Sequence, residues 1–149
     1  MIETRFQYVT YIKAPPEAVW DALTSPEAMK TYFFGLPFEA EWKVGGPWRR
    51  HFPDGALMTE GEILEFDPPA RLVMSWRNAE AEKKAEGFSR CVMEIEAVDT
   101  AAKLTVTHSV GVANSKLIAA VAQAWPQVLS NLKTFLETGM VALTAPSRT

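Results

Sequence analysis

The stretch that decides the fold is GEILEFDPPARLVMSW, residues 61–76, in the middle of the chain. Two apolar runs flank the turn-forming sequence Asp67-Pro68-Pro69. Proline and aspartate supply turn geometry that a strand interior does not use, so the stretch predicts antiparallel strands at residues 56–66 and 71–76. Gly61 lies inside the first strand and predicts a β-bulge there.

The same pattern continues on both sides of this hairpin. Gly45-Gly46-Pro47 and Pro53-Asp54-Gly55 mark further turns. Apolar runs between the turns, and an alternating run near the N-terminus, predict five more strands: residues 4–13, 38–42, 48–52, 88–98 and 103–109. The segment at 77–90 is dense in Glu and Lys, and we expect it to form a solvated hairpin tip.

Proline and capping signals predict three helices. Pro16 and Pro26 each stand at a favoured first helical position, so two short helices are expected directly after the first strand, the second with Ser25 as its N-cap. Apolar residues recur every three or four positions between Ser115, a capping residue, and the stop signal Gly139, which predicts a long amphipathic helix. Pro126 lies inside it without an N–H to donate, so we expect a kink or a break in the preceding turn.

The predicted elements define an α+β fold. A strand, two short helices, six more strands and one long helix favour a curved antiparallel sheet of about seven strands closed by the C-terminal helix. Such a sheet leaves room between itself and the helix. We expect one domain over residues 1–143 and a C-terminal tail over 144–149, because 149 residues are too few for two separate cores.

Composition narrows the location and the partners. The chain has 48% hydrophobic and 22% charged residues and a net charge of -3, which excludes a large basic surface for nucleic acid. Its least charged stretch is too polar to cross a bilayer, and charged residues near the N-terminus argue against a signal peptide. Cys91 is the single cysteine and has no intramolecular partner. We therefore expect a reducing, cytoplasmic location.

Five segments, taken in order, resemble one protein family. They are APPEAVW at 14–20, VGG at 44–46, GEILEFDPPARLVMSW at 61–76, LTVTHS at 104–109 and WPQVLSNLKTFLETG at 125–139. Together they are similar to the START-like (SRPBCC, helix-grip) superfamily, in the branch of the activator of heat-shock-protein-90 ATPase homologues. The resemblance implies a cavity between the sheet and the long helix. Relatives use this cavity to bind lipids, polyketides and other hydrophobic molecules, and some are cyclases, dehydratases or hydrolases.

Tryptophan, methionine and histidine side chains are the candidates for lining such a cavity. An indole combines a large apolar face with one hydrogen-bond donor, and methionine adapts to irregular shapes. The predicted ligand-binding residues are Trp42, Trp48, Trp76, Met74, Met93, His108 and Trp125. Met58 could add to this lining. The alternative for all of them is ordinary core packing.

Three side chains are candidates for acid–base catalysis. His108 shares a strand face with apolar neighbours and could point into the cavity, and Glu65 is a candidate inward carboxylate. His51 shares a strand face with Arg49, where a solvated position is the alternative. No metal site is expected, because the sequence has no zinc-ligand spacing, and no cofactor is expected because it has no phosphate-binding loop. Cys91 is expected to be an inert buried thiol.

Three functions remain open from the sequence. The first is binding of a small hydrophobic or aromatic molecule without a cofactor. The second is a cofactor-independent enzyme acting on such a molecule in the same cavity. The third is a co-chaperone or regulatory interaction module, for which the branch name implies a chaperone contact. A homodimer is compatible with each of them.

Overall fold

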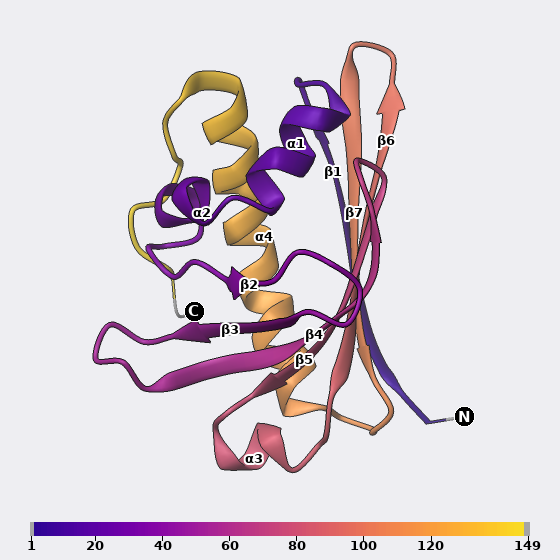
Figure 1. Ribbon diagram of the computed structural model, residues 1–149, viewed down its shortest axis with the longest axis vertical. Coiled ribbons are helices and arrows are strands. Elements are labelled where there is room, and N and C mark those ends of the chain that lie inside the picture. The colour runs from indigo at the N-terminus through magenta and orange to yellow at the C-terminus, as the bar shows by residue number, and fades with distance from the viewer. Residues whose placement is uncertain (1, 148–149) are drawn as a thin grey trace.

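The computed structural model describes residues 2–147 and has the expected α+β architecture (Figure 1). Its strands are β1 (Thr4–Ile12), β2 (Glu39–Ala40), β3 (Pro47–His51), β4 (Leu57–Asp67), β5 (Arg71–Asn78), β6 (Ser89–Val98) and β7 (Ala101–Val110). Its helices are α1 (Pro16–Leu23), α2 (Pro26–Tyr32), α3 (Ala81–Lys84) and α4 (Lys116–Thr138). Two short helices follow the first strand, and a long helix closes the fold, as the sequence predicts.

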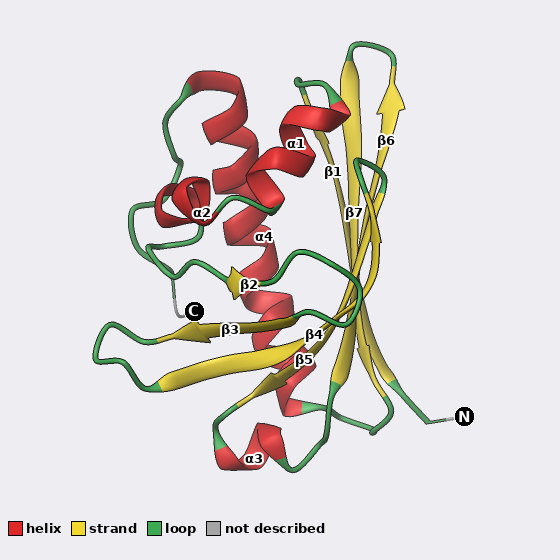
Figure 2. Ribbon diagram, in the orientation of Figure 1, coloured by secondary structure: helices red, strands yellow, loops and turns green. Residues whose placement is uncertain are grey.

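The seven strands form a single open antiparallel sheet. Its order is β1-β7-β6-β5-β4-β3-β2, so the first strand pairs with the last and the remaining strands form a meander. Figure 2 shows α1, α2 and α4 on one side of this sheet. The sheet twists strongly, so that β3 and β4 run across the view while β1 and β7 run up it. The curvature leaves a concave face toward α4.

The strands lie where the turn signals predict them. Every strand end lies within two residues of the sequence expectation, and β2 is the strand shortened at both ends. We expected a strand over 38–42, whereas the structure pairs only Glu39 and Ala40 with β3. Phe38 instead leaves the strand and packs into the core, where 2% of its surface is exposed.

Local signals position the helix ends. The Ser25 hydroxyl accepts a hydrogen bond from the Ala28 N–H at 3.1 Å, and the Ser115 hydroxyl accepts one from the Ile118 N–H at 2.9 Å. Each bond satisfies a backbone donor that the first turn of a helix leaves free. Gly139 ends α4 with φ of 79°, a left-handed conformation that glycine adopts without a steric penalty. Both predicted caps and the predicted stop are confirmed.

Pro126 does not break α4. The helix is continuous from Lys116 to Thr138, so the expected split near Trp125 is wrong, and the bend stays a prediction. The missing proline N–H removes one backbone bond, whereas the apolar side of α4 buries eight residues against the rest of the fold. Burial outweighs that loss.

No helix among residues 2–147 combines the length and apolar character needed to cross a membrane.

The segment between β5 and β6 is more ordered than a solvated hairpin tip. It contains α3, a single helical turn whose end is tied to the start of α4. The Glu86 carboxylate accepts hydrogen bonds from the Ser115 hydroxyl and the Lys116 N–H, and Lys116 forms an ion pair with Glu82 at 2.7 Å. These partners come from a distant part of the chain, so charge density alone did not predict them.

Gly61 has a packing role and does not form a bulge. It lies in register opposite Trp48, and the irregularities of β4 fall between Ile63 and Glu65 and between Leu57 and Thr59. A Cβ atom at position 61 would lie 1.9 Å from the Ser75 carbonyl oxygen and 2.5 Å from the Trp48 indole nitrogen. Trp48 donates to that same carbonyl at 2.9 Å. Glycine therefore makes space for the indole, and the bulge prediction is wrong.

The hydrophobic core fills most of the space between the concave face and α4. Burial alternates regularly along β7, where every second residue from Ala102 to Val110 is buried. From α4, Val128 and Leu132 are buried in the same core, and Phe135 is half-buried against it. The interior is therefore largely packed. Space remains toward the middle of α4.

Candidate functional site

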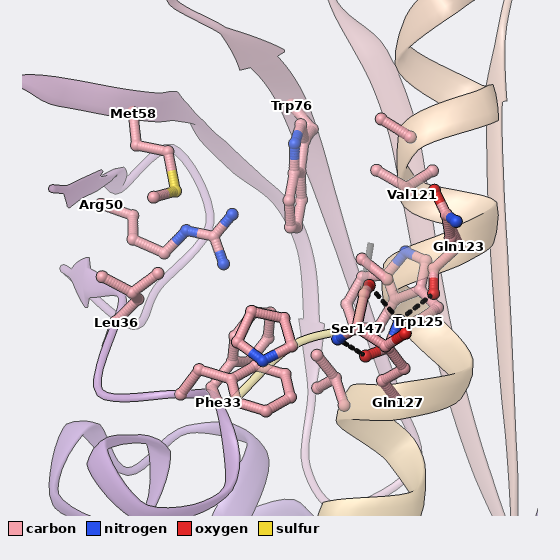
Figure 3. Close-up of a pocket in the computed structure, with 15 residues that line it drawn as sticks. Phe33, Leu36, Arg50, Met58, Trp76, Val121, Gln123, Trp125, Gln127 and Ser147 are labelled. Carbon is pink, nitrogen blue, oxygen red and sulfur yellow. Dashed lines mark hydrogen bonds between the residues drawn. The ribbon is translucent and has the colours of Figure 1, made fainter. Parts of the chain in front are cut away.

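A cavity of about 340 Å³ lies beside the middle of α4. It is lined by β3, β4, β5, the segment after α2, and the chain's C-terminal segment (Figure 3). Its lining is dominated by aromatic and apolar side chains, with a few polar groups. The lining residues are Phe33, Phe34, Leu36, Arg50, Met58, Trp76, Ala120, Val121, Gln123, Ala124, Trp125, Gln127, Val128, Pro146 and Ser147.

Two tryptophans form the inner wall of this cavity. Trp76 faces inward because β5 alternates and places it on the same face as Met74, and Trp125 lies on the buried side of α4. Their ring centroids are 5.7 Å apart, and Phe33 meets Trp125 edge-on at 5.9 Å. The indole N–H of Trp76 donates to the Asn78 side chain at 3.1 Å, which fixes its ring orientation. The wall is thus rigid and aromatic.

His108 lies directly behind this wall and does not line the cavity. The Trp125 indole N–H donates to His108 Nδ1 at 3.2 Å, so Nδ1 carries no proton. The proton of the neutral ring is then on Nε2 and is donated to the Ser89 hydroxyl at 2.8 Å. Ser89 in turn donates to the Trp76 carbonyl at 2.7 Å. This chain of bonds joins the two cavity tryptophans through one histidine.

Burial keeps His108 neutral. The side chain is fully buried, and desolvation lowers its pKa to about 3. A proton on Nδ1 would also remove the acceptor for Trp125. His108 therefore holds Trp125 in position, and both of its ring nitrogens are already engaged.

Arg50 is the ionisable side chain of the cavity lining. β3 alternates between exposed and buried residues, so Arg50 shares the inward face with Trp48 while Arg49 faces solvent. Its guanidinium carbon lies 4.8 Å from the ring centre of Phe33 and 5.4 Å from that of Trp76. Burial lowers the pKa of Arg50 to about 9, so the group stays charged at neutral pH.

Some of the predicted ligand-binding residues line the cavity, and the others lie outside the lining. Trp76 and Trp125 line the cavity, and so does Met58. Met74, Met93 and Trp48 are buried in the core outside the lining, where they pack as ordinary apolar side chains. Trp42 is only partly buried and packs against the core away from the cavity. His108 contacts the wall from behind.

The other two catalytic candidates lie away from the cavity. Glu65 is half-exposed and pairs with Arg71 and Arg90, each at 3.0 Å. These hydrogen bonds and charges, Arg71 first, hold the pKa of Glu65 below its usual value. It is therefore not an inward carboxylate. His51 lies at the end of β3, with its Nδ1 3.7 Å from the Glu39 carboxylate.

Sequence reasoning missed three parts of the cavity lining: Arg50, the residues directly after α2, and the C-terminal segment. Strand alternation was a usable signal for Arg50, because it places this residue on the face of Trp48. Phe33, Phe34 and Leu36 follow a short helix, and nothing local indicates that they reach a cavity. Their position is set by packing against elements far along the chain.

The C-terminal segment closes one side of the cavity. The described part of the predicted tail, residues 144–147, returns along α4, and residues 148–149 lie outside the described residues. The Ser147 N–H donates to the Gln127 side chain at 2.7 Å, and Gln127 donates back to the Ser147 carbonyl at 3.1 Å. Further along α4, the buried Asn131 exchanges two hydrogen bonds with the backbone of Leu143.

Two other expectations concern reactive groups. Cys91 is a free, fully buried thiol on β6, so its expected burial is confirmed, and burial raises its pKa. Among the described residues, no group of three His, Cys, Asp or Glu side chains could hold a metal ion.

Solved structures with this fold place the chain among known proteins. ChR145 from Cytophaga hutchinsonii is 27% identical with a TM-score of 0.74, covering 93% of this chain and 97% of that one. MLL2253 from Mesorhizobium loti is 21% identical with a TM-score of 0.78, covering 90% and 97%. The Aha1 dimer from Colwellia psychrerythraea is 20% identical with a TM-score of 0.74, covering 91% and 98%. No curated protein matches the chain at a significant level.

The family assignment comes from the sequence itself. Residues 13–137 match the family described as "Activator of Hsp90 ATPase homolog 1-like protein". The match begins directly after β1 and extends almost to the end of α4, so it includes every other element of the fold. This confirms the resemblance drawn from the five sequence segments. The chain is a START-like, helix-grip protein that belongs to the family of Activator of Hsp90 ATPase homolog 1-like proteins.

Proposed function

We propose that this protein binds a small, mainly apolar molecule in the cavity beside α4. The observation that carries the proposal is the aromatic lining, in which Phe33, Trp76 and Trp125 surround about 340 Å³ of space. Water in such a cavity finds few hydrogen-bond partners, so an apolar ligand gains free energy by displacing it. Rigid ring faces suit a flat aromatic or acyl group.

The size of the cavity limits the ligand. Binding sites for small molecules usually measure about 300 to 1,000 Å³, and this cavity is near the lower limit. One or two fused rings, or a short acyl chain, would fill it. A large polyketide or a membrane lipid would require the C-terminal segment to move away from Gln127.

Binding is better supported than acid–base catalysis. Within the described lining, Arg50 is the ionisable group, and neither a carboxylate nor an imidazole nor a thiol is present. His108, the earlier candidate, lies behind the wall and uses both ring nitrogens in hydrogen bonds. A ligand in the cavity would meet aromatic faces and one cation. These are groups for recognition, and none of them is suited to proton transfer near neutral pH.

Other parts of the proposal concern partners and location. A homodimer and a chaperone contact are suggested by the names of the family and of the Colwellia relative. We propose them as secondary to ligand binding, because the cavity is the feature with a defined chemistry. We also propose a cytoplasmic location, for which the free, buried thiol of Cys91 is the supporting feature.

The proposal is tested with a neutral aromatic probe. 2-Naphthamide has about 13 non-hydrogen atoms, which at about 0.3 kcal/mol each predicts a dissociation constant of about 1 mM or tighter. Isothermal titration calorimetry of the whole chain measures this binding. The informative variant is Ala124→Leu, because Ala124 lines the cavity and is exposed, so a larger side chain fills the space without disturbing the core.

A matched control lies on the same helix. Ala119 is also exposed but lies outside the lining, so Ala119→Leu makes the same chemical change elsewhere on α4. We expect Ala124→Leu to weaken binding at least about tenfold and Ala119→Leu to leave it unchanged. Trp76→Ala should also weaken binding. The proposal would be contradicted if the native protein does not bind the probe, or if Ala124→Leu and Ala119→Leu bind it equally well.

A further inference from the structure

Arg50 is an unusual residue for the wall of an apolar cavity. It lies on β3 in register with Thr59 of β4, and only 8% of its surface is exposed. Three aromatic rings surround its guanidinium group, with centres 4.8 Å away for Phe33, 5.3 Å for Phe38 and 5.4 Å for Trp76. In Figure 3 its terminal nitrogens point toward the middle of the cavity lining.

This guanidinium has no anionic partner. Among the described residues, no carboxylate forms an ion pair with Arg50, and its Nε atom is buried without a hydrogen-bond acceptor. Other arginines of the sheet are paired: Arg71 and Arg90 with Glu65, and Arg77 with Glu60. The hydroxyl of Thr59, opposite Arg50, is likewise buried without a partner. Two neighbouring polar side chains on this inward face are therefore unsatisfied.

A purely structural role accounts poorly for this arrangement. Removing a cation from water is costly, and contacts with ring faces offset only part of that cost. An apolar side chain of similar length, such as methionine, would fill the same space between Phe33 and Trp76 with no charge to desolvate. The charge becomes useful when an acceptor occupies the cavity.

We propose that the cavity binds a small aromatic or acyl carboxylate whose carboxylate group is held by Arg50. This inference rests on the proposed binding function and specifies its ligand class. The planar guanidinium can donate two parallel N–H bonds to the two oxygens of a carboxylate. The apolar part of the ligand then lies against Trp76, Trp125 and Met58, which line the rest of the cavity.

The lining favours a carboxylate over a phosphate. Phosphate groups carry more charge and are usually bound by several cationic side chains or by a cluster of backbone N–H groups. Here the described lining offers one cation surrounded by aromatic rings. A single negative charge matches this single guanidinium and leaves no further charge unpaired in the cavity.

The test compares two ligands of nearly the same shape. 2-Naphthoate has a carboxylate where 2-naphthamide has a neutral amide, so the difference in their affinities reports on the charge. Using titration calorimetry at pH 7.5, we expect the native protein to bind 2-naphthoate about 10- to 100-fold more tightly than 2-naphthamide. Arg50→Met should lose this preference and keep its affinity for 2-naphthamide.

Arg49→Met is the matched control. Arg49 precedes Arg50 on β3, faces solvent, and its substitution removes the same charge from the protein. We expect Arg49→Met to keep the preference for 2-naphthoate. Urea unfolding checks that Arg50→Met is folded, which is expected because replacing a buried charge by an apolar side chain is often neutral or stabilising.

The outcomes distinguish failure of the carboxylate proposal from failure of the proposed ligand binding. If the native protein binds both ligands equally, the carboxylate proposal is overturned while the cavity proposal stands, and this comparison needs no variant. The carboxylate proposal would also be overturned if Arg50→Met keeps the preference for 2-naphthoate, or if Arg49→Met loses this preference to the same extent as Arg50→Met. If the native protein binds neither ligand, the proposed binding function itself fails.

Discussion

Gly61→Ala is expected to damage both the sheet and the cavity wall. The added Cβ would lie 1.9 Å from the Ser75 carbonyl oxygen, far inside the contact distance of two such atoms, and 2.5 Å from the Trp48 indole nitrogen. The carbonyl belongs to the backbone of β5 and cannot rotate away. Either β4 and β5 separate locally, or the indole of Trp48 leaves its position.

The cost can be estimated from the contacts that are lost. Overpacking a well-filled site costs about 1 to 3 kcal/mol, and losing the Trp48 to Ser75 hydrogen bond adds about 1 kcal/mol. We therefore expect the free energy of unfolding to fall by about 2 to 4 kcal/mol. Because Trp48 contacts Trp76 at a centroid distance of 4.9 Å, we also expect weaker binding of 2-naphthamide.

The assay is urea unfolding followed by tryptophan fluorescence. Gly111→Ala serves as the control, because a Cβ atom at Gly111 would meet no atom within 4 Å and its backbone is not in the left-handed region. This control should change stability by no more than about 0.5 kcal/mol. If Gly61→Ala and Gly111→Ala unfold at the same urea concentration as the native protein, the reasoning about Trp48 is refuted.

The remaining predictions concern His108 and Leu132. In the unfolded chain His108 has its ordinary pKa of about 6.5, whereas burial in the folded state lowers this pKa to about 3. The contribution of His108 to the free energy of unfolding is therefore fully present above pH 6.5 and decreases as the pH falls below that value. Between pH 7.5 and pH 5 this contribution should fall by about 2 kcal/mol in urea titrations, and His108→Gln, which keeps a donor and an acceptor but does not titrate, should remove that loss. Equal losses in both proteins would show that His108 is not the group responsible. Leu132→Ala should destabilise the protein by about 2 to 5 kcal/mol because Leu132 is fully buried, and Leu136→Ala, on a half-buried position of the same helix, should cost less; equal costs would show that the buried face of α4 is misassigned.

The sequence by itself determined the local structure of this protein. Turn and capping signals act over a few residues, so Ser25, Ser115 and Gly139 could be assigned from their neighbours alone. Apolar runs between turn signals likewise identified most strands, and alternation identified the first, since side chains on opposite faces of a sheet meet different environments. The same signals gave the order of the elements, and the family resemblance added the expectation of a ligand-binding cavity.

Tertiary structure decided where the cavity lies and what surrounds it. Its walls come from segments about one hundred residues apart, so no local pattern distinguishes Trp76, which lines it, from Trp48, which is buried in the core. The role of a charged residue was similarly ambiguous in the sequence. Arg49 and Arg50 are neighbours, and they differ in that β3 places Arg49 on its exposed face and Arg50 on its buried face.

Polar residues inside α4 show the same limit. Asn131 interrupts an apolar pattern in the sequence, yet it is fully buried because its side chain hydrogen-bonds the backbone of Leu143 and of Tyr32. The free energy of burying a polar group depends on whether partners are present in the fold. Those partners are 12 and 99 residues away along the chain, and only the folded structure brings them within reach.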